Sequence, residues 1–242
     1  MNLPSLRNGL IAAVFFGTFG TIGGGVLAAE ETVSPPAPKG EAIATFAGGC
    51  FWCVESDFDT VPGVSRTLSG YTGGTSIDPT YKQVSAGGTG HIEAVRIFFD
   101  PKKVSYAMLL EIFWRSVDPT DDGGQFCDRG ESYETAIFAN SAEQKRLAEA
   151  SKGRLQRSGV LKRPIVTPIQ AAGPFYAAED YHQDFYKKSS LRYRIYRYGC
   201  GRDARVEHVS NHSRRAPRPP FSGVDSPHDL VCQLGGWMRG WQ

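Results

Sequence analysis

The chain has little cysteine and no strong excess of positive or negative charge. Both observations reduce the number of functions that the chain could have. Of the five cysteines only Cys50 and Cys53 form a close pair, whereas Cys127, Cys200 and Cys232 are isolated. A four-cysteine zinc site normally needs a second close pair, so this spacing argues against zinc. The 27 basic and 25 acidic residues nearly cancel, which gives no argument for nucleic acid or an anionic membrane as partner.

A cluster of arginines late in the chain does not change this view. The arginines lie among tyrosines, a pattern that RNA-binding surfaces also show. We interpret them instead as a solvated face with some ion pairing. They are Arg192, Arg194, Arg197, Arg202 and Arg205.

Long apolar runs are absent beyond the first 29 residues. Residues 1–28 carry Arg7 and then an apolar, glycine-rich run that ends at Ala28 and Ala29, which is the pattern of a cleaved secretory signal peptide. An uncleaved membrane anchor is the alternative. The proline-rich residues 29–40 predict a flexible linker. We therefore expect an exported, periplasmic protein that depends on a dedicated reductant.

The segment GGCFWC at residues 48–53 follows a strand-like apolar run and precedes a helix-like run. Cys50 is therefore expected at the start of a helix. The unpaired N–H groups and the positive dipole end of a helix stabilise a thiolate, which predicts a lowered pKa and a nucleophilic Cys50. Phe51 and Trp52 are expected to form an apolar pocket wall.

The spacing of Cys50 and Cys53 also allows other interpretations. One is a dithiol–disulfide oxidoreductase of thioredoxin type, although two bulky aromatics fill the intervening positions. Others are a structural disulfide and a buried, inert cysteine. A non-catalytic module that binds methionine-rich or oxidised peptides through Phe51 and Trp52 is a further possibility. This segment alone leaves these alternatives open.

Further glycine-rich and aromatic segments follow in order along the chain. Together with residues 48–55, this series closely resembles the peptide methionine sulfoxide reductases of the A type, from about residue 41 to about residue 209. The segments are GYTGG at 70–74, PTY at 79–81, GGTGHIEAV at 87–95, GGQFCDRG at 123–130, SY at 132–133, AGPFY at 172–176, EDYHQ at 179–183 and YGCGRD at 198–203.

Glu93 begins an alternating run in which Val95, Ile97 and Phe99 share its face. A carboxyl group on an apolar face loses hydration, so its pKa should rise and it should stay protonated near neutral pH. The alternative from the residues alone is a carboxylate at the wet end of a strand that pairs with Arg96. The resemblance implies that Glu93 protonates the sulfoxide oxygen while a thiolate attacks the sulfur.

The resemblance also implies roles for side chains around this pair. Tyr81 and Tyr133 correspond to the tyrosines that hold the sulfoxide oxygen, and Asp128 corresponds to their polar partner. Phe51 and Trp52 correspond to the residues that hold the substrate methyl group. A pocket of methyl size would accept many peptide contexts.

A second thiol must condense with the sulfenic acid that forms on Cys50. The candidates are Cys53, Cys127, Cys200 and Cys232. Because the family commonly keeps a resolving cysteine in the region of Cys200, we predict a Cys50–Cys200 disulfide. Cys53 lies about one helical turn from Cys50, which is awkward for a disulfide. Cys127 is expected to stay reduced and to be structural.

About 170 residues, 41–209, predict a single catalytic domain of the α+β class. Ser105 and Ser141 are predicted helix N-caps, the second in a capping box with Gln144. The resemblance implies a two-layer sandwich of ferredoxin-like type with extensive glycine-rich coil. Strands are expected at 43–46, 93–99, 135–139 and 165–169, and helices at 50–60, 106–117, 142–156 and 177–187.

Residues 210–242 lie beyond the resemblance and are expected to be a largely disordered extension, in which Cys232 makes the cysteine count odd. The expected function is thiol-dependent reduction of methionine S-sulfoxide, protein-bound and free, for repair of oxidised exported proteins. We expect no bound cofactor or metal, a thioredoxin-like or other dithiol as electron donor, oxidised proteins or peptides as substrates, and a monomer.

Overall fold

The computed structural model describes residues 35–205 and 207. The predicted signal segment 1–28, linker residues 29–34 and the extension 210–242 lie outside the described residues. Within the described part of the chain, no helix is both long and apolar enough to cross a membrane.

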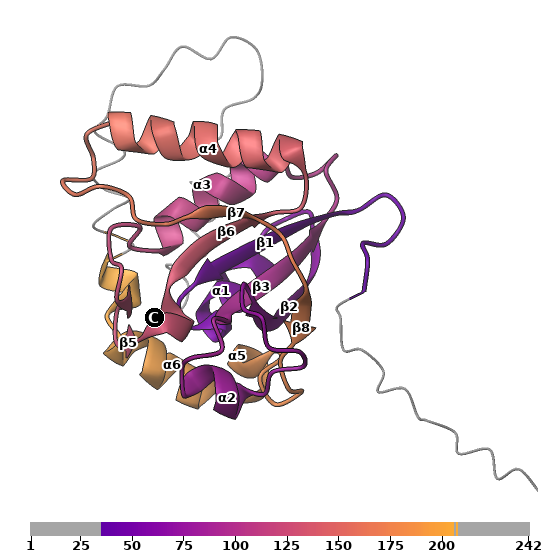
Figure 1. Cartoon of the computed structure of the whole chain (residues 1–242), viewed down its shortest axis with the longest axis vertical. Coiled ribbons are helices and arrows are strands. Elements are labelled where there is room, and N and C mark those ends of the chain that lie inside the picture. The colour runs from indigo at the N-terminus through magenta and orange to yellow at the C-terminus, as the bar shows by residue number, and fades with distance from the viewer. Residues whose placement is uncertain (1–34, 206, 208–242) are drawn as a thin grey trace, which may run out of the picture. The chain divides into compact units, whose positions relative to one another are not determined.

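A six-stranded sheet organises the fold, with the strand order β7-β6-β1-β3-β2-β8 (Figure 1). Neighbouring strands are antiparallel except β6 and β7, which are parallel. A separate hairpin pairs β4 (Gly124–Gln125) with β5 (Asp128–Arg129). The strands of the sheet are β1 (Ala42–Gly48), β2 (Val64–Thr72), β3 (Ile92–Phe99), β6 (Thr135–Ala139), β7 (Ile169–Ala171) and β8 (Phe175–Ala177).

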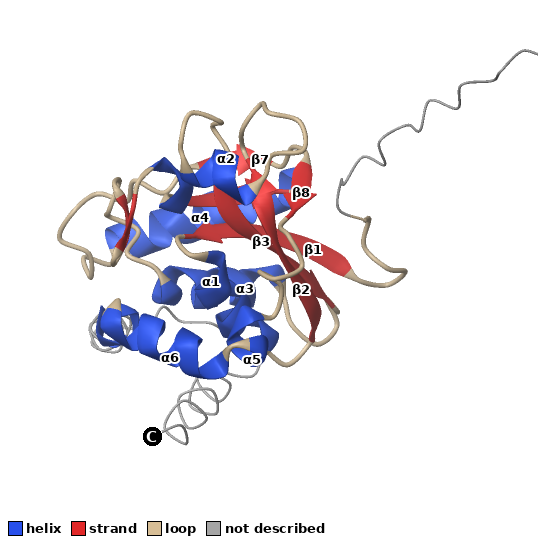
Figure 2. Cartoon of the chain, turned by 90° about the horizontal axis from the view of Figure 1, so that it is seen from below, coloured by secondary structure: helices blue, strands red, loops and turns tan. Residues whose placement is uncertain are grey.

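Helices pack on the sheet, and the prediction of a mixed α+β fold is confirmed. In Figure 2 α5 and α6 lie beyond α1, on the side away from the sheet. The ferredoxin-like detail of the arrangement stays a prediction. The helices are α1 (Phe51–Asp59), α2 (Tyr81–Ser85), α3 (Tyr106–Ser116), α4 (Ala142–Arg157), α5 (Phe185–Lys188) and α6 (Ser190–Gly199), with a 3₁₀ turn, η1 (Glu131–Tyr133).

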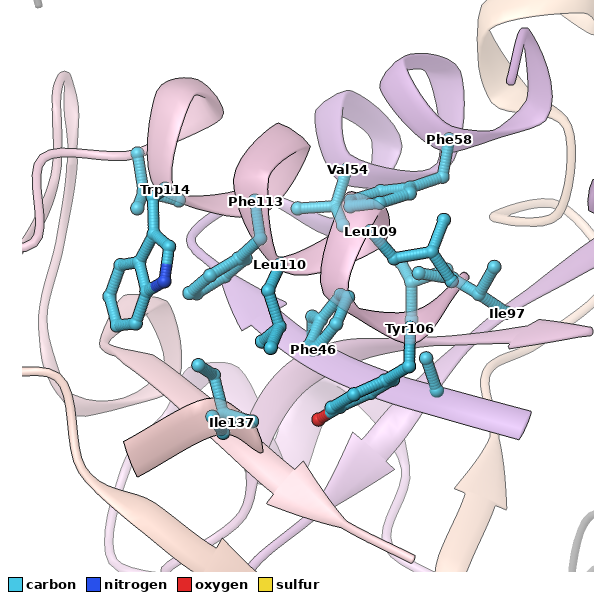
Figure 3. Packing of buried hydrophobic residues seen from close by; sticks show 14 of the residues in the cluster. Phe46, Val54, Phe58, Ile97, Tyr106, Leu109, Leu110, Phe113, Trp114 and Ile137 are labelled. Atoms are coloured by element: carbon cyan, nitrogen blue, oxygen red, sulfur yellow. The ribbon is translucent and has the colours of Figure 1, made fainter. Parts of the chain in front are cut away.

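The core lies between the central strands and helices α1 and α3 (Figure 3). Alternation along the strands points Phe46, Ile97 and Ile137 to this side, and all three are fully buried. The Phe46 ring centroid lies 5.0 Å from that of Phe113 in α3 and 5.5 Å from that of Phe58 in α1. This contact fixes α1, and with it the residue at its N-terminal end, against β1 and β3.

The predicted serine caps are confirmed. The Ser105 hydroxyl accepts a hydrogen bond from the Met108 N–H at 3.2 Å, and the Ser141 hydroxyl accepts one from the Gln144 N–H at 3.1 Å. The capping box at the second site is incomplete, because the Gln144 amide oxygen accepts instead from the Asn140 N–H at 2.9 Å. Both helices therefore start where the sequence indicates.

Two predicted elements are wrong. The helix predicted at 177–187 is present only in its last three residues, which begin α5. The Gln183 side chain bonds to both the N–H and the carbonyl oxygen of Ser69, each at 2.9 Å, and so holds the preceding non-helical residues against β2. The strand predicted at 165–169 is mainly coil. Its backbone donors bond outside the sheet: the Ile165 N–H to the Gln156 side chain at 2.8 Å, and the Val166 N–H to the Pro119 carbonyl oxygen at 2.8 Å. Neither β2, α2, β8 nor α6 was predicted.

Candidate active site

Cys50 lies in the turn between β1 and α1, where it is the N-cap of α1. Gly49 before it has a φ of 78°, a left-handed conformation that favours glycine. A Cβ atom on Gly49 would lie 2.5 Å from the Gln125 Cβ, so the turn has no room for a side chain. Arg202 Nη1 donates a hydrogen bond to the Gly48 carbonyl oxygen at 3.1 Å. The turn that presents Cys50 is therefore held from two sides.

The Cys50 thiol is buried, with only 5% of the residue exposed. Burial is the main reason that the pKa of Cys50 is raised, and its hydrogen bond with Cys53 acts in the same direction. The predicted lowering of this pKa is therefore wrong for the resting site, because lost hydration outweighs the effect of the helix end. Cys50 carries its proton at rest and must release it during attack.

Glu93 of β3 lies next to the same helix end. Its side chain is 3% exposed, and its Oε2 atom accepts a hydrogen bond from the Phe51 N–H at 2.9 Å. Burial raises the pKa of Glu93 to about 8, while the hydrogen bond from Phe51 opposes the shift. The burial that strand alternation predicts is confirmed. Glu93 is therefore protonated at neutral pH, at the helix end that Cys50 caps.

Two phenol groups lie within interaction range of Glu93. Tyr81 begins α2 and Tyr133 ends η1, and their hydroxyl groups are hydrogen-bonded to each other. Burial is the main reason that the pKa of both phenols is raised, so both are neutral donors. Asp128 of β5 lies on the same side, and burial raises the pKa of its carboxyl group.

The two aromatic residues after Cys50 lie at different depths. Phe51 is buried, whereas Trp52 is half-buried and stacks on Phe185 with 3.8 Å between ring centroids. His182 joins them: its ring centroid lies 4.9 Å from that of Phe51, and its Nδ1 accepts a hydrogen bond from Trp52 Nε1 at 3.1 Å. Burial lowers the pKa of His182, so the hydrogen bond between Trp52 and His182 joins two neutral side chains.

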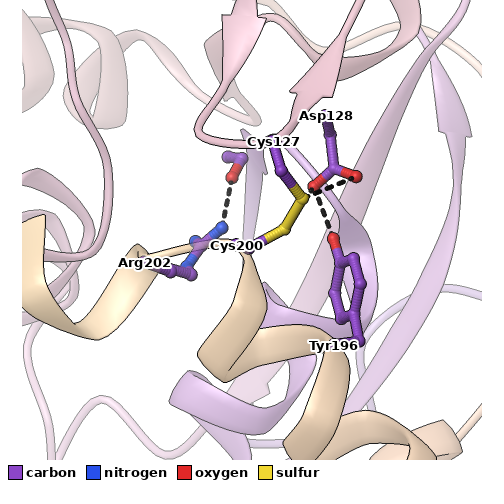
Figure 4. Close-up of a disulfide and its surroundings, with 6 residues drawn as sticks. Cys127, Asp128, Tyr196, Cys200 and Arg202 are labelled. Atoms are coloured by element: carbon purple, nitrogen blue, oxygen red, sulfur yellow. Dashed lines mark hydrogen bonds between the residues drawn. A yellow bond between two sulfur atoms is a disulfide. The ribbon is translucent and has the colours of Figure 1, made fainter.

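A disulfide joins Cys127 and Cys200 beside this site (Figure 4). Cys127 is exposed in the turn between β4 and β5, and Cys200 is the half-buried C-cap of α6. The Tyr196 hydroxyl, one helical turn before Cys200, bonds to both Asp128 and the Cys50 thiol. The expectation that Cys127 stays reduced is therefore wrong. Among the described residues, the free cysteines are Cys50 and Cys53.

Cys127 and Cys200 also form a potential metal-binding group with Asp128. Their sulfur atoms and a carboxylate oxygen lie within 4.8 Å of one another. Because both sulfurs are bonded to each other, they are not available as thiolate ligands in this state. The arrangement suits thiol–disulfide chemistry better.

In the late cluster Arg202 is buried and Arg197 is half-buried, so the predicted solvated face is wrong for these two arginines. Arg202 is 1% exposed, and Arg197 Nη1 lies 2.7 Å from Asp57 Oδ1 of α1. Arg192 and Arg194 are exposed, as predicted. Through Asp57, these two arginines hold α6 and the residues after it against α1.

The family model of the peptide methionine sulfoxide reductases matches residues 42–214. That range contains the Cys50 turn, Glu93 and the disulfide. The chain belongs to this family. The recognition from the glycine-rich segments is therefore confirmed, and with it the expectation of an enzyme.

Individual A-type reductases are similar to this reductase over most of their length. The chain is 54% identical to the peptide methionine sulfoxide reductase MsrA of Bacillus pumilus over 167 residues, which cover 69% of this chain and 94% of the relative. It is 58% identical to MsrA of Bacillus subtilis over 160 residues, which cover 66% and 90%. Methionine sulfoxide reductase A of Corynebacterium diphtheriae has a similar structure, with a TM-score of 0.57 at 28% identity, covering 66% of this chain and 85% of that one.

Sequence reasoning assigned no role in this reductase to three side chains that shape its site: Glu179, His182 and Tyr196. Glu179 accepts hydrogen bonds from the Tyr81 N–H at 2.9 Å and from the Tyr71 hydroxyl at 2.8 Å. Glu179 and His182 belong to the EDYHQ segment of the resemblance, which was an available signal. No sequence signal distinguished Tyr196, because it is one of several tyrosines in an arginine-rich stretch.

Proposed function

We propose that this enzyme reduces methionine S-sulfoxide, in peptides and as the free amino acid, with Cys50 as nucleophile and Glu93 as acid. The family supports reduction of methionine sulfoxide by cysteine thiol chemistry. The observation that carries the assignment is the hydrogen bond from the Phe51 N–H to Glu93. This bond holds a protonated carboxyl group at the start of the helix that Cys50 caps.

Proton transfer accompanies the attack on sulfur. The Cys50 sulfur attacks the sulfoxide sulfur while Glu93 gives its proton to the sulfoxide oxygen. The Cys50 thiol proton passes to the Glu93 carboxylate, and the hydroxyl group moves to Cys50 as the sulfide leaves. The sulfoxide is reduced to methionine, and Cys50 is oxidised to a sulfenic acid. Tyr81 and Tyr133 donate hydrogen bonds to the oxygen, with Asp128 as their polar partner.

The methyl group of the substrate lies against Phe51 and Trp52. Two observations support this assignment. Both residues directly follow Cys50, and contacts with His182 and Phe185 hold their rings in place. An apolar surface of this kind binds a methyl group and makes few demands on the rest of a peptide.

Thiol–disulfide exchange among three cysteines then transfers the oxidised state from the buried Cys50 to the surface. The Cys200 thiol condenses with the Cys50 sulfenic acid, which forms a disulfide and releases water. The Cys127 thiol attacks the Cys200 sulfur, which frees Cys50 as a thiol and leaves Cys127 joined to Cys200. The observed disulfide and the exposure of Cys127 support this order, because an external reductant has little access to the buried Cys50.

A dithiol–disulfide exchange function of Cys50 and Cys53 has less support. The two residues are 5% and 1% exposed. A thiolate must contact the disulfide sulfur that it attacks, and a protein disulfide has little access to either thiol.

We further propose an exported, periplasmic monomer that repairs oxidised proteins and is reduced by a thioredoxin-like dithiol protein. The signal pattern of residues 1–28 supports export, and the surface position of Cys127 supports a protein reductant. The reaction needs no bound cofactor, because the electrons pass between sulfur atoms.

A stereochemical assay tests the function. The S and R epimers of dabsyl-methionine sulfoxide are incubated separately with the enzyme and dithiothreitol, and the products are separated by chromatography. We expect the S epimer to be converted to the sulfide and the R epimer to remain. Conversion of neither epimer overturns the proposed function, and conversion of the R epimer alone overturns the choice of epimer.

Trapping of intermediates tests the order of the three cysteines. After one turnover without reductant, mass spectrometry should find the Cys127–Cys200 disulfide in the wild type and a Cys50–Cys200 disulfide in Cys127→Ser. In Cys200→Ser we expect a Cys50 sulfenic acid that reacts with dimedone. Cys53→Ser is the matched control and should keep the wild-type disulfide. A wild-type enzyme that accumulates a Cys50–Cys53 disulfide would contradict the order.

A further inference from the structure

Cys53 is a buried nucleophile that the proposed mechanism does not use. It is 1% exposed and lies in the first turn of α1, directly beyond the N-cap Cys50 and the two aromatic residues. Its thiol is hydrogen-bonded to that of Cys50. Among the described residues these are the two free cysteines, whereas Cys127 and Cys200 are joined (Figure 4). The structure thus combines an oxidised pair beside the surface with a reduced pair at the active site.

The backbone around Cys50 permits a disulfide with Cys53. As the N-cap of α1, Cys50 has a φ of −49° and a ψ of 118°, so it lies outside the helical conformation. The Cys53 N–H donates a hydrogen bond to the Cys50 carbonyl oxygen at 3.1 Å, which closes a tight turn between the two residues. The difficulty of bridging two cysteines inside a helix therefore does not apply, because the first of them is not helical.

The groups around Cys53 favour its thiolate. The pKa of the Cys53 thiol is lowered, chiefly because the Cys50 thiol donates a hydrogen bond to it. The positive charges of Arg202 and Arg197 act in the same direction, against the effects of burial and of the Asp57 carboxylate. The pKa of Cys50 is raised, so Cys53 is the more acidic thiol of the pair. Because the thiolate is the nucleophile, Cys53 is well placed to react when Cys50 is oxidised.

We propose that Cys53 is a second resolving cysteine, which condenses with oxidised Cys50 once Cys127 and Cys200 are already joined. The inference rests on the proposed function, which supplies the Cys50 sulfenic acid. With Cys127 and Cys200 oxidised, Cys50 is again a thiol and reduces a second sulfoxide. Cys200 then has no thiol with which to resolve the product, whereas Cys53 is free and in contact with Cys50.

The second turnover balances without an added reactant. Cys50 becomes a sulfenic acid as the second sulfoxide is reduced to the sulfide. The Cys53 sulfur attacks the Cys50 sulfur, the S–O bond of the sulfenic acid breaks, and its hydroxyl group leaves as water with the proton of the Cys53 thiol. Four thiols have then reduced two sulfoxides and end as two disulfides. A sulfenic acid that is converted to a disulfide is no longer open to irreversible oxidation to sulfinic acid.

The Cys50–Cys53 disulfide is reduced through the other pair. When a dithiol donor has reduced Cys127 and Cys200, the Cys200 thiol attacks the Cys50 sulfur and releases Cys53 as a thiol. The Cys127 thiol then displaces Cys50 from Cys200, as in the first cycle. The donor therefore needs no access to the two buried cysteines.

Counting product and disulfides tests this role. The full-length enzyme is reduced, freed of reductant and given an excess of the S epimer of dabsyl-methionine sulfoxide, and dimedone is added when sulfide release stops. We expect the wild type to release about two equivalents of sulfide. Mass spectrometry should then find the Cys127–Cys200 and Cys50–Cys53 disulfides and no dimedone adduct. Cys53→Ser should also release about two equivalents but should end with dimedone on Cys50.

Cys200→Ser gives a second test, because it lacks the first resolving thiol. Dimedone that is present from the start competes with Cys53 for the Cys50 sulfenic acid and captures it as an adduct. When dimedone is withheld, mass spectrometry should find a Cys50–Cys53 disulfide after about one equivalent of sulfide. A Cys50 sulfenic acid that persists there beside a free Cys53 thiol overturns the inference.

Cys127→Ser is the matched control. Its Cys50 stays in a disulfide after the first sulfoxide, so it should stop at about one equivalent of sulfide. Release of only one equivalent by the wild type, or a dimedone adduct on its Cys50 after the second equivalent, also overturns the inference. This wild-type result decides the question even if Cys53→Ser does not fold. Release of no sulfide by the wild type would instead refute the proposed function.

Discussion

Replacing Cys50 with serine should abolish sulfoxide reduction, with a loss of at least about 1,000-fold in the rate with dithiothreitol. A serine hydroxyl is a far weaker nucleophile than a cysteine sulfur and forms no sulfenic acid. Serine is also a favoured N-cap residue, so α1 should keep its start and the protein its fold. Consumption of a methyl sulfoxide measures the loss, and circular dichroism verifies that the helices remain.

Cys53→Ser is the matched control for this prediction. It makes the same sulfur-to-oxygen change one helical turn away, at a residue that is 1% exposed. We expect it to keep the rate of sulfoxide reduction within about tenfold, since the proposed chemistry does not pass through Cys53. Dithiol exchange would require both sulfurs. Equal losses in the two variants would therefore argue for that chemistry, and full activity in Cys50→Ser would remove Cys50 as the nucleophile.

The parts of the site that the sequence could predict depend on short-range pattern. Alternation along residues 93–99 predicted that Glu93 would share the apolar face of its strand, and it is buried there. The order of apolar runs around residue 50 predicted a strand, a turn and a helix, which are β1, the Gly49 turn and α1. Each of these inferences uses residues within about one element length of the site.

The parts that the sequence could not predict depend on contacts between distant segments. The cysteines of the observed disulfide are 73 residues apart, and they meet because the β4–β5 turn and the end of α6 both lie beside Cys50. The direction of the Cys50 pKa shift was missed for the same reason. A helix start is visible in the sequence, but the burial that outweighs it comes from the surrounding elements.

Glu93→Gln should lower kcat by roughly 100- to 10,000-fold, the usual contribution of a general acid. The glutamine amide oxygen can still accept the hydrogen bond from the Phe51 N–H, so the change removes the acidic proton and little else. In the wild type, kcat should fall as the pH rises through about 8, because Glu93 then loses its proton. The residual activity of the variant should lack this fall. Steady-state kinetics across this pH range measure both effects.

Glu55→Gln is the control that matches this change in chemistry and burial. Glu55 is 1% exposed, burial raises its pKa to about 7, and its Oε2 accepts a hydrogen bond from the Asp184 N–H at 3.0 Å, on the α5 side of α1. We expect it to keep the wild-type kcat and the fall near pH 8. Equal losses in the two variants would indicate that any buried carboxyl group suffices and would contradict the assignment of Glu93.

Stability measurements distinguish two causes of a low kcat in Glu93→Gln: loss of the acidic proton and loss of the folded structure. The pKa of each buried carboxyl group is raised above its unfolded value of 4.5, so the folded state binds more protons than the unfolded state at intermediate pH. The free energy of unfolding should therefore decrease as the pH rises from about 4.5 to about 8 for Glu93, and to about 7 for Glu55. In each glutamine variant, the part of this decrease that comes from the replaced carboxyl group should be absent. In urea unfolding at pH 8, both variants should be at least as stable as the wild type. If Glu93→Gln were less stable, its low kcat could no longer be assigned to the loss of the acidic proton.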